Sequence, residues 1–450
     1  MNKKNITFLL FGASGDLAKR KLILALFSLF LKEEYNFLLI GTAKEEKSIK
    51  DIFNNACSFI KKQTPEQCKK FLERFYYCSF DIFNKKEQEE FAKKIEEVEK
   101  KHGFFESMHV AYCATPSDLF IPITTLLSTT HLIKNFNDCI VYEKPFGTSL
   151  EDAKQINKVI SQHFNEKQIF RVDHYLTKEL VQSIINLRFS NVIFEPLLNN
   201  KFVEEVQIIA NEEIGIEGRI SYYDHYGAIK DMVQNHLLSL LSLISFEKQD
   251  DNFAQTISEA RQTILQHVIF DGGILGQYEG YQDEIGRESK TENFAALTFF
   301  VNNERWNNVP FFVKTGKCLE KKQTIIYITF REPHTSFKNI LTLEIAPESI
   351  FSLSLNIKAP GKKNIISVPL EFCHSCIFAA ETPESYEILL REVFLNDHVV
   401  AVSQKETEIA WEITEKIIEK NLPLFLYKKG SRGPDELKNF EKKYNMLWKS

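Results

Sequence analysis

The stretch ITFLLFGASGDL at residues 6–17 decides the first half of the fold. An apolar run leads into a turn that contains Gly12 and Gly15, and a helical pattern follows. This arrangement is typical of a nucleotide-binding βαβ unit, because glycines let the backbone approach a pyrophosphate and the helix N-terminus favours its charge. The Gly-x-x-Gly spacing alone often marks only a tight turn. Its position after the first strand favours a dinucleotide site.

The same alternation continues to about residue 175. Short apolar runs recur at 37–40, 75–80, 109–113, 139–142 and 168–172. Segments between them, such as 85–101 and 149–164, have the length and charge pattern of helices. Buried strands that alternate with helices indicate a parallel sheet covered on both faces. We therefore predict a Rossmann-like α/β domain over residues 1–175.

The pattern changes after Lys178. A helical run at 179–189 is followed by strand-like segments at 203–208, 294–302, 324–331, 339–346 and 350–357. Short turns between the later segments are typical of an antiparallel sheet. Helical patterns at 231–244, 384–395 and 410–420 are expected to cover one face of it. We predict an α+β domain over residues 176–450 with a large, mainly antiparallel sheet.

Composition excludes several classes of protein. The chain has 450 residues, 44% hydrophobic and 26% charged, which is an ordinary globular balance. A net charge of -5 argues against nucleic-acid binding, and no apolar stretch is long enough to span a membrane. The short apolar run at 6–11 is followed at once by charged residues, so we expect no secretion signal and a cytoplasmic location.

The eight cysteines are scattered, and only CHSC at 373–376 has the spacing of metal ligands. A single Cys-x-x-Cys pair without a second pair is weak evidence for a metal site. We therefore expect no metal, and we expect Cys373 and Cys376 to be thiols beside a strand.

Two further stretches carry reactive side chains, RVDHYLTKE at 171–179 and DMVQNHL at 231–237. The first places an acid, an imidazole, a phenol and an amine within six positions, just after a strand-like run. The second places an imidazole in an otherwise apolar helix. Buried polar groups are costly unless they are paired, so both stretches indicate a reactive site. The structural alternatives are a solvated helix start for 174–178 and a core histidine for His236.

The end of the second predicted strand helps to choose the nucleotide. It reads IGTAK at 40–44, and a hydroxyl followed by the ammonium group of Lys44 suits the 2′-phosphate of NADP. Glu45 and Glu46 weaken this interpretation. They either begin the next helix, where acids are favourable, or repel a phosphate and permit NAD.

Taken in order, these motifs resemble those of the glucose-6-phosphate dehydrogenase family. They span nearly the whole chain: GASGDLAKRKL at 12–22, EKPFG at 143–147, DHYLTKE at 173–179, YYD at 222–224, QNH at 234–236, PFFVKTGK at 310–317 and KGSRGP at 429–434. The resemblance implies oxidation of D-glucose 6-phosphate at C1 to 6-phosphoglucono-1,5-lactone with hydride transfer to NADP. This is the first oxidative step of the pentose phosphate pathway, and the resemblance implies a homodimer or homotetramer.

The reaction also assigns roles from its chemistry. Oxidation of a hemiacetal needs a base for the C1 hydroxyl proton, and a neutral imidazole titrates in the right range. We expect His236 to be this base. Asp173 is expected to pair with it and stabilise the imidazolium. His174, Tyr175 and Lys178 are expected to bind the phosphate, with His174 and Lys178 on one face if a helix begins there.

The resemblance implies the remaining site residues. Glu212, Asp231 and Lys317 are expected to bind the sugar hydroxyls or the phosphate, and Lys21 and Lys144 to orient sugar and nicotinamide. The expected coenzyme-binding residues are Gly12, Ser14, Gly15, Asp16, Leu17, Lys44, Thr115 and Lys144. Pro145 after Lys144 offers a cis peptide bond, although the sequence does not determine the isomer.

Three positions depart from the family pattern. Thr177 stands where glycine is usual, and Lys314 and Cys318 replace the usual arginines. Lysine keeps the charge but loses the bidentate geometry, which makes substrate affinity less certain than the reaction. Two alternatives stay open. The chain could be a related two-domain oxidoreductase for an unphosphorylated sugar, or a catalytically silent relative.

Overall fold

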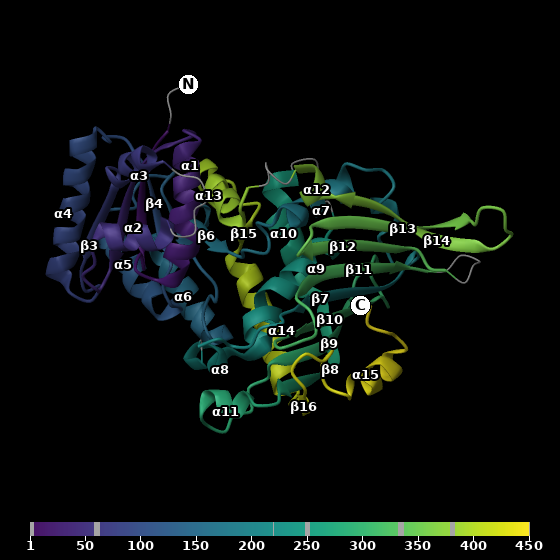
Figure 1. The fold of residues 1–450 in the computed structure, drawn as a ribbon. Helices are drawn as coiled ribbons and strands as arrows, with labels where there is room; N and C mark the ends of the chain where they lie inside the picture. Colours follow the sequence, from purple (N-terminus) through teal and green to yellow (C-terminus); the bar gives the residue numbers. More distant parts are fainter. Residues whose placement is uncertain are drawn as a thin grey trace. The chain divides into compact units, whose positions relative to one another are not determined.

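The computed structural model describes residues 4–57, 64–218, 220–247, 253–331, 337–378 and 383–449. The chain forms two compact units (Figure 1). The first comprises Met1–Thr177 and Pro383–Thr407, and the second comprises Lys178–Thr382 and Glu408–Ser450.

The first unit is built on a seven-stranded sheet in the order β15-β6-β5-β4-β1-β2-β3. Its strands are β1 (Asn5–Phe11), β2 (Asn36–Ala43), β3 (Phe75–Ser79), β4 (Met108–Cys113), β5 (Cys139–Tyr142), β6 (Ile169–Val172) and β15 (Ala401–Val402). Strands β1 to β6 are parallel, as predicted, and only β15 is antiparallel to its neighbour. The strand order reverses between β1 and β4. Open α/β sheets bind ligands at such a point.

Helices connect the strands of the first unit. They are the π-helical segment η1 (Ala18–Leu22), α1 (Ile23–Leu31), α2 (Ile49–Cys57), α3 (Pro65–Leu72), α4 (Lys85–His102), η2 (Ser117–Leu119), α5 (Phe120–Thr129), α6 (Leu150–His163), η3 (Glu166–Gln168) and α13 (Ser385–Leu395). Helix α4 illustrates the local determinants. The side chain of Asn84 accepts from the backbone N–H of Lys86 and Glu87, and Gly103 ends the helix with a φ of 73°.

Helix α13 corrects the prediction for 384–395. The helix forms where expected, but it packs against α1 in the first unit (Figure 1), so its assignment to the second sheet was wrong. Leu390 and Phe394 are buried in one core with Phe8. The Phe394 ring lies 6.1 Å from Phe8 and 5.1 Å from Tyr35, both edge-on. An apolar helix face shows that a helix is buried without showing which sheet buries it.

The second unit contains a nine-stranded sheet in the order β14-β13-β12-β11-β7-β10-β9-β8-β16. Its strands are β7 (Val203–Asn211), β8 (Val268–Tyr278), β9 (Phe294–Val301), β10 (Pro310–Gly316), β11 (Gln323–Phe330), β12 (Ile340–Ala346), β13 (Ile350–Lys358), β14 (Ile365–Cys373) and β16 (Leu424–Tyr427). Only the β7–β10 and β8–β16 pairs are parallel. The sheet is therefore mainly antiparallel, as predicted.

The helices of the second unit begin with α7 (Glu179–Phe189), which has the predicted bounds. The others are η4 (Glu195–Leu197), α8 (Ile220–Ala228), the π-helical segment η5 (Ile229–Leu237), α9 (Leu238–Ser245), α10 (Phe253–Gln266), α11 (Tyr281–Ile285), α12 (His374–Phe378), most of α14 (Gln404–Glu419), and α15 (Leu437–Tyr444). Among the described residues, no helix has both the length and the apolar character needed to cross a bilayer.

Adjacent residues of β10 show that helices lie on both faces of this sheet. Phe311 packs on Trp306, whose indole N–H donates to the carbonyl of Ser245 at the end of α9. Phe312 packs on Phe440 of α15. Because neighbouring residues of a strand point to opposite faces, α15 covers the face opposite to α9.

Phe394 provides a test of the α13 assignment. We expect Phe394→Ala to lower the free energy of unfolding by about 3–5 kcal/mol, because it removes a buried ring from the first unit's core. The matched control is Leu395→Ala, whose side chain is 66% exposed and should change stability by less than about 0.5 kcal/mol. Urea unfolding of both variants measures the difference. Equal effects would contradict the packing of α13 on this core.

Candidate active site

The turn after β1 has no room for a side chain at Gly12. Gly12 has a φ of 84°, and a Cβ atom there would lie 2.3 Å from the carbonyl oxygen of Ala114. The backbone N–H groups of Gly12 and Ala13 donate to the carbonyl of Thr42 at 2.9 and 3.1 Å, and Gly15 N–H donates to Gly12. The turn is thus bound to the end of β2, and it follows β1 at the edge where the strand order reverses.

The hydroxyl groups beside this turn suit a bound dinucleotide. The Oγ1 atoms of Thr42 and Thr115 are shielded from solvent, and neither has a hydrogen-bond partner among the described residues. The methyl group of Thr115 lies 3.2 Å from the position that a Cβ of Gly12 would take. Unsatisfied buried hydroxyls are rare and call for an explanation, and a polar coenzyme at this turn would provide one.

Lys44 lines a hollow of about 910 Å³ at the carboxyl ends of β2 and β3. Its Nζ lies 3.0 Å from Asp81, a residue that the sequence did not single out. The N–H of Phe83 and the Lys44 ammonium group lower the pKa of Asp81. Glu45 pairs at 2.6 Å with Lys47, which also lines the hollow. The acid that offsets Lys44 is therefore Asp81, and the charge of Glu45 is balanced separately.

Lys21 and Glu143, the neighbour of Lys144, have partners from a distant part of the chain. Lys21 lies in η1, with its Nζ 3.7 Å from Glu384. Beside Lys144, the buried carboxyl group of Glu143 accepts from Tyr112 at 2.5 Å and also bonds to Tyr386. Burial raises the pKa of Glu143 to about 7 despite these hydrogen bonds. The Lys144-Pro145 bond is cis. No local signal identified Glu384 or Tyr386, because both lie more than 200 residues further along the chain.

A tight turn follows β6. Asp173 Oδ1 accepts from Tyr175 N–H at 2.8 Å, and its carbonyl accepts from Leu176 N–H at 3.0 Å. The rings of His174 and Tyr175 lie 5.2 Å apart. The hydroxyl of the buried Thr177 donates to the carbonyl of His174 at 2.9 Å. Thr177, which stands where the family usually has glycine, therefore adds a hydrogen bond that closes the turn.

The helical spacing expected for His174 and Lys178 is wrong. Helix α7 begins only at Glu179, and Lys178 precedes it with extended backbone angles, φ -71° and ψ 133°. The Asp173 side chain accepts from Tyr175 N–H within a turn that ends before α7 begins. Any shared role of His174 and Lys178 must therefore come from the turn geometry and not from one helix face.

In the second unit, Glu212 and Lys317 lie side by side. They directly follow β7 and β10, which pair in parallel with Asn211 opposite Gly316. The Lys317 ammonium group forms an ion pair with Glu212, and Lys317 is only 2% exposed. The carboxyl ends of adjacent parallel strands meet at one edge, which explains why residues 105 positions apart are neighbours.

Tyr223 links this ion pair to Asp231. Lys317 Nζ lies 4.9 Å from the centre of the Tyr223 ring. Burial raises the pKa of Tyr223 well above its ordinary value, and the charges of Asp231 and Glu212 raise it further. Tyr222 donates to Asp231 at 3.1 Å. The two tyrosines belonged to a quoted motif but were not predicted as site residues.

His236 is fully buried near the end of η5. The predicted helix over 231–244 is present, but its first part is π-helical. π-Helical segments are rare and frequently occur at functional sites. Leu240 and Leu243 are also buried, as the core-histidine alternative requires. Burial alone does not separate the two roles, so the role of His236 stays a prediction.

The substitutions at 314 and 318 have structural explanations. Lys314 is buried with its Nζ 4.8 Å from the centre of the Trp448 ring. Burial lowers its pKa to about 8, and the charge of Arg432 contributes. Cys318 lies in a hydrophobic cluster with Ile216 and Leu319, where a guanidinium group would be costly.

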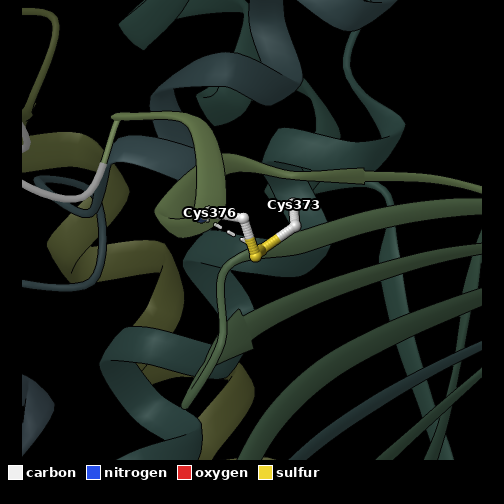
Figure 2. Close-up of a disulfide and its surroundings, with 2 residues drawn as sticks. All are labelled: Cys373 and Cys376. Carbon is white, nitrogen blue, oxygen red and sulfur yellow. Dashed lines mark hydrogen bonds between the residues drawn. A yellow bond between two sulfur atoms is a disulfide. The ribbon is translucent and has the colours of Figure 1, made fainter.

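Cys373 and Cys376 form a disulfide, so the expectation of free thiols was wrong. Figure 2 shows the bond and the hydrogen bond from Cys376 N–H to Cys373 Sγ at 3.1 Å. The first turn of α12 brings the two Cα atoms to 5.2 Å, within the range that a disulfide spans. Both sulfur atoms are committed to this bond, so Cys373 and Cys376 are not thiols here.

Comparison with known proteins identifies relatives over the full length. The family model for the NAD binding domain of glucose-6-phosphate dehydrogenase matches residues 9–183, and that for its C-terminal domain matches residues 185–449. The glucose-6-phosphate 1-dehydrogenase of Borreliella burgdorferi is 35% identical, covering 96% of each chain. That of Streptococcus pneumoniae is 35% identical and covers 98% of this chain and 95% of its own.

Solved structures agree. A glucose-6-phosphate dehydrogenase in complex with its substrate glucose-6-phosphate superposes with a TM-score of 0.93 at 29% identity, covering 100% of this chain and 99% of its own. Glucose-6-phosphate 1-dehydrogenase from Mycobacterium avium gives a TM-score of 0.87 at 28% identity, with the same coverage of both chains. Levoglucosan dehydrogenase, at 10% identity and a TM-score of 0.55, shares the fold alone.

Proposed function

This chain belongs to the glucose-6-phosphate dehydrogenase family, and we propose from this that it oxidises D-glucose 6-phosphate at C1 to 6-phosphoglucono-1,5-lactone. The coenzyme supplies the hydride acceptor. The observation that carries the proposal is the ion pair of the buried Lys317 with the partly exposed Glu212. Tyr223 and Asp231 lie beside this pair and complete a set of donors and acceptors suited to a polyhydroxy substrate.

His236 is the proposed base, and Asp173 is its proposed acid partner. A neutral imidazole accepts the proton of the C1 hydroxyl group, and a carboxylate stabilises the imidazolium that results. His174, Tyr175 and Lys178 are proposed to bind the phosphate. The presence of His236, Asp173 and Lys178 favours an active enzyme over a silent relative. The phosphate ligands favour a phosphorylated sugar over a free one.

The test is coenzyme reduction with glucose 6-phosphate and with free glucose, using wild type and His236→Asn. We expect reduction with the phosphorylated sugar only. The variant should lose about 10²–10⁴-fold in kcat with little change in KM, because a positioned base contributes that much.

The matched control is His267→Asn, an exposed imidazole of the second unit, which should keep wild-type activity. Near-wild-type turnover of His236→Asn would remove His236 from the mechanism. Comparable rates with free glucose would support the unphosphorylated-sugar alternative. No reduction by folded wild-type protein would support the silent relative.

We propose NADP as the preferred coenzyme, with NAD as a secondary one. Lys44 and Lys47 both line the hollow beside β2, and Thr42 precedes them with a buried hydroxyl group. Lys44 pairs with Asp81, but it is 80% exposed, so its ammonium group is accessible to a 2′-phosphate.

A cytoplasmic location also stays a prediction from the sequence.

Lys44→Ala tests the coenzyme proposal. We expect kcat/KM for NADP to fall about tenfold to a hundredfold, because a hydrogen bond to a charged group contributes about 1.5–3 kcal/mol. The value for NAD should change much less. Lys50→Ala, an exposed lysine of α2 outside the hollow, is the control. Parallel losses with both coenzymes would exclude Lys44 as the phosphate ligand.

We also propose a homo-oligomer, a homodimer or homotetramer, that uses the hairpin of β13 and β14. This hairpin extends beyond the helices of its unit (Figure 1). One of its faces is apolar along the whole length: Phe351, Leu353, Leu355, Ile357, Ile366, Val368, Leu370 and Phe372 lie opposite one another in pairs. Leu355 is 40% exposed and Leu370 is 60% exposed. Contiguous exposed apolar surface of this kind marks association sites.

Leu370→Glu should convert the oligomer to smaller species, because it places a charge in the centre of the apolar face. Sedimentation velocity at matched concentrations measures the change. Glu371→Ala, on the opposite face of the same strand, should leave the oligomer intact. A wild-type protein that is monomeric at every concentration would contradict the proposal.

A further inference from the structure

We propose that Glu292 is a positioning residue that anchors the first turn of η5 and thereby holds Asp231 and His236 in place. This inference rests on the function proposed above and adds a residue to it. Glu292 lies two positions before β9 and 56 positions after His236 in the sequence, and it was not recognised from any motif.

Glu292 satisfies two backbone donors at the start of η5. Its side-chain Oε1 accepts from Ile229 N–H at 2.9 Å. Its main-chain carbonyl accepts from Ala228 N–H at 3.0 Å. The first N–H groups of a helix have no partners within it, so these two bonds determine where η5 begins and in which direction it runs. Asp231 and His236 follow two and seven residues after Ile229.

Gly227 leaves space for this carboxyl group. The chain kinks at Gly227, near the end of α8, with a φ of 63°. A Cβ atom on Gly227 would lie 2.4 Å from Glu292 Oε1 and 2.7 Å from its carboxyl carbon. No other residue type can occupy position 227 while the carboxyl group stays where it is. The glycine and the acid therefore form one local arrangement.

The residue after Glu292, Asn293, connects the same segment to Lys317. The carbonyl of Asn293 accepts from Lys317 N–H at 2.9 Å. Asn293 is itself held by β8: its N–H donates to Gly276 at 2.7 Å, and its side chain accepts from Tyr278 N–H at 3.2 Å. Two consecutive residues thus fix the helix that carries His236 and the backbone of a proposed sugar ligand. A displacement of residues 292–293 would therefore affect both the helix and the Lys317 backbone.

The charge of Glu292 changes near neutral pH. Burial raises its pKa to about 7, although the N–H groups of Ile229 and of Glu292 itself, and the charge of Lys230, act in the opposite direction. The other titratable groups that face it are Tyr223 of α8 and Tyr281 of α11. The ionised carboxylate makes a stronger, charge-assisted bond to Ile229 N–H, and negative charge is favourable at a helix N-terminus.

The experiment compares Glu292→Gln, which keeps the shape and the acceptor, with Glu292→Ala, which removes both. Values of kcat/KM for glucose 6-phosphate are measured from about pH 6 to about pH 9. We expect the ratio of Glu292→Gln to wild type to be near one below pH 7 and to fall several-fold above it. Only wild type gains the carboxylate as the pH rises through about 7. Glu292→Ala should lose about tenfold or more at every pH.

Thermal unfolding separates positioning from simple stabilisation. An acid whose pKa is raised in the folded state contributes stability that is fully present below its ordinary pKa and is lost as the pH rises through about 7. The Tm of wild type should therefore fall relative to that of Glu292→Gln across this window. Above pH 7 the Gln variant should be more stable and yet less active, and these opposite shifts are the signature of a positioning role.

Glu288→Gln, an exposed acid in the preceding loop, is the control and should match wild type in both measurements. An activity ratio that stays at one at every pH would overturn the role of Glu292. So would an activity loss that follows a loss of Tm. Inactive wild-type protein would instead contradict the proposed function itself. If Glu292→Ala does not fold, the Gln variant alone decides the matter.

Discussion

The candidate site in the second unit depends on a buried cation, Lys317, whose charge must be compensated. Lys317 is almost inaccessible to water, and an ammonium group in that position is tolerated only with a close partner. Glu212 provides the partner because β7 and β10 run parallel and end together. The ring of Tyr223 covers the same ammonium group, and Asn293 holds the backbone of Lys317. Charge compensation and strand pairing thus build the part of the candidate site that is proposed to bind the sugar.

In each unit, an acid with a raised pKa lies beside proposed reactive groups. Glu143 is bound by two tyrosines next to Lys144, and Glu292 is bound by backbone N–H groups at the start of η5. Burial raises the pKa of both acids to about 7. In both cases, hydrogen bonds to distant residues fix the element that carries the reactive side chains.

Much of the fold was predictable because its signals are local. Apolar runs that alternate with helical patterns indicated the parallel sheet, and α7 has the predicted bounds. The turn at Gly12 was recognisable because a close backbone approach requires glycine. The candidate residues were recognisable because they lie in motifs that resemble those of the family, two of which place acids, imidazoles and amines close together. Their roles in binding and catalysis remain proposals.

The sequence by itself determined the element types, the family and the list of candidate side chains, since periodicity and motifs are properties of neighbouring residues. Only the tertiary structure decided which distant surfaces meet: α13 packs on the first unit, Asp81 pairs with Lys44, and Glu292 binds Ile229. The turn before α7 was equally hidden: the Asp173 side chain accepts from Tyr175 N–H there, and α7 begins only at Glu179. Such contacts depend on shape and on unsatisfied backbone groups, which no local pattern records.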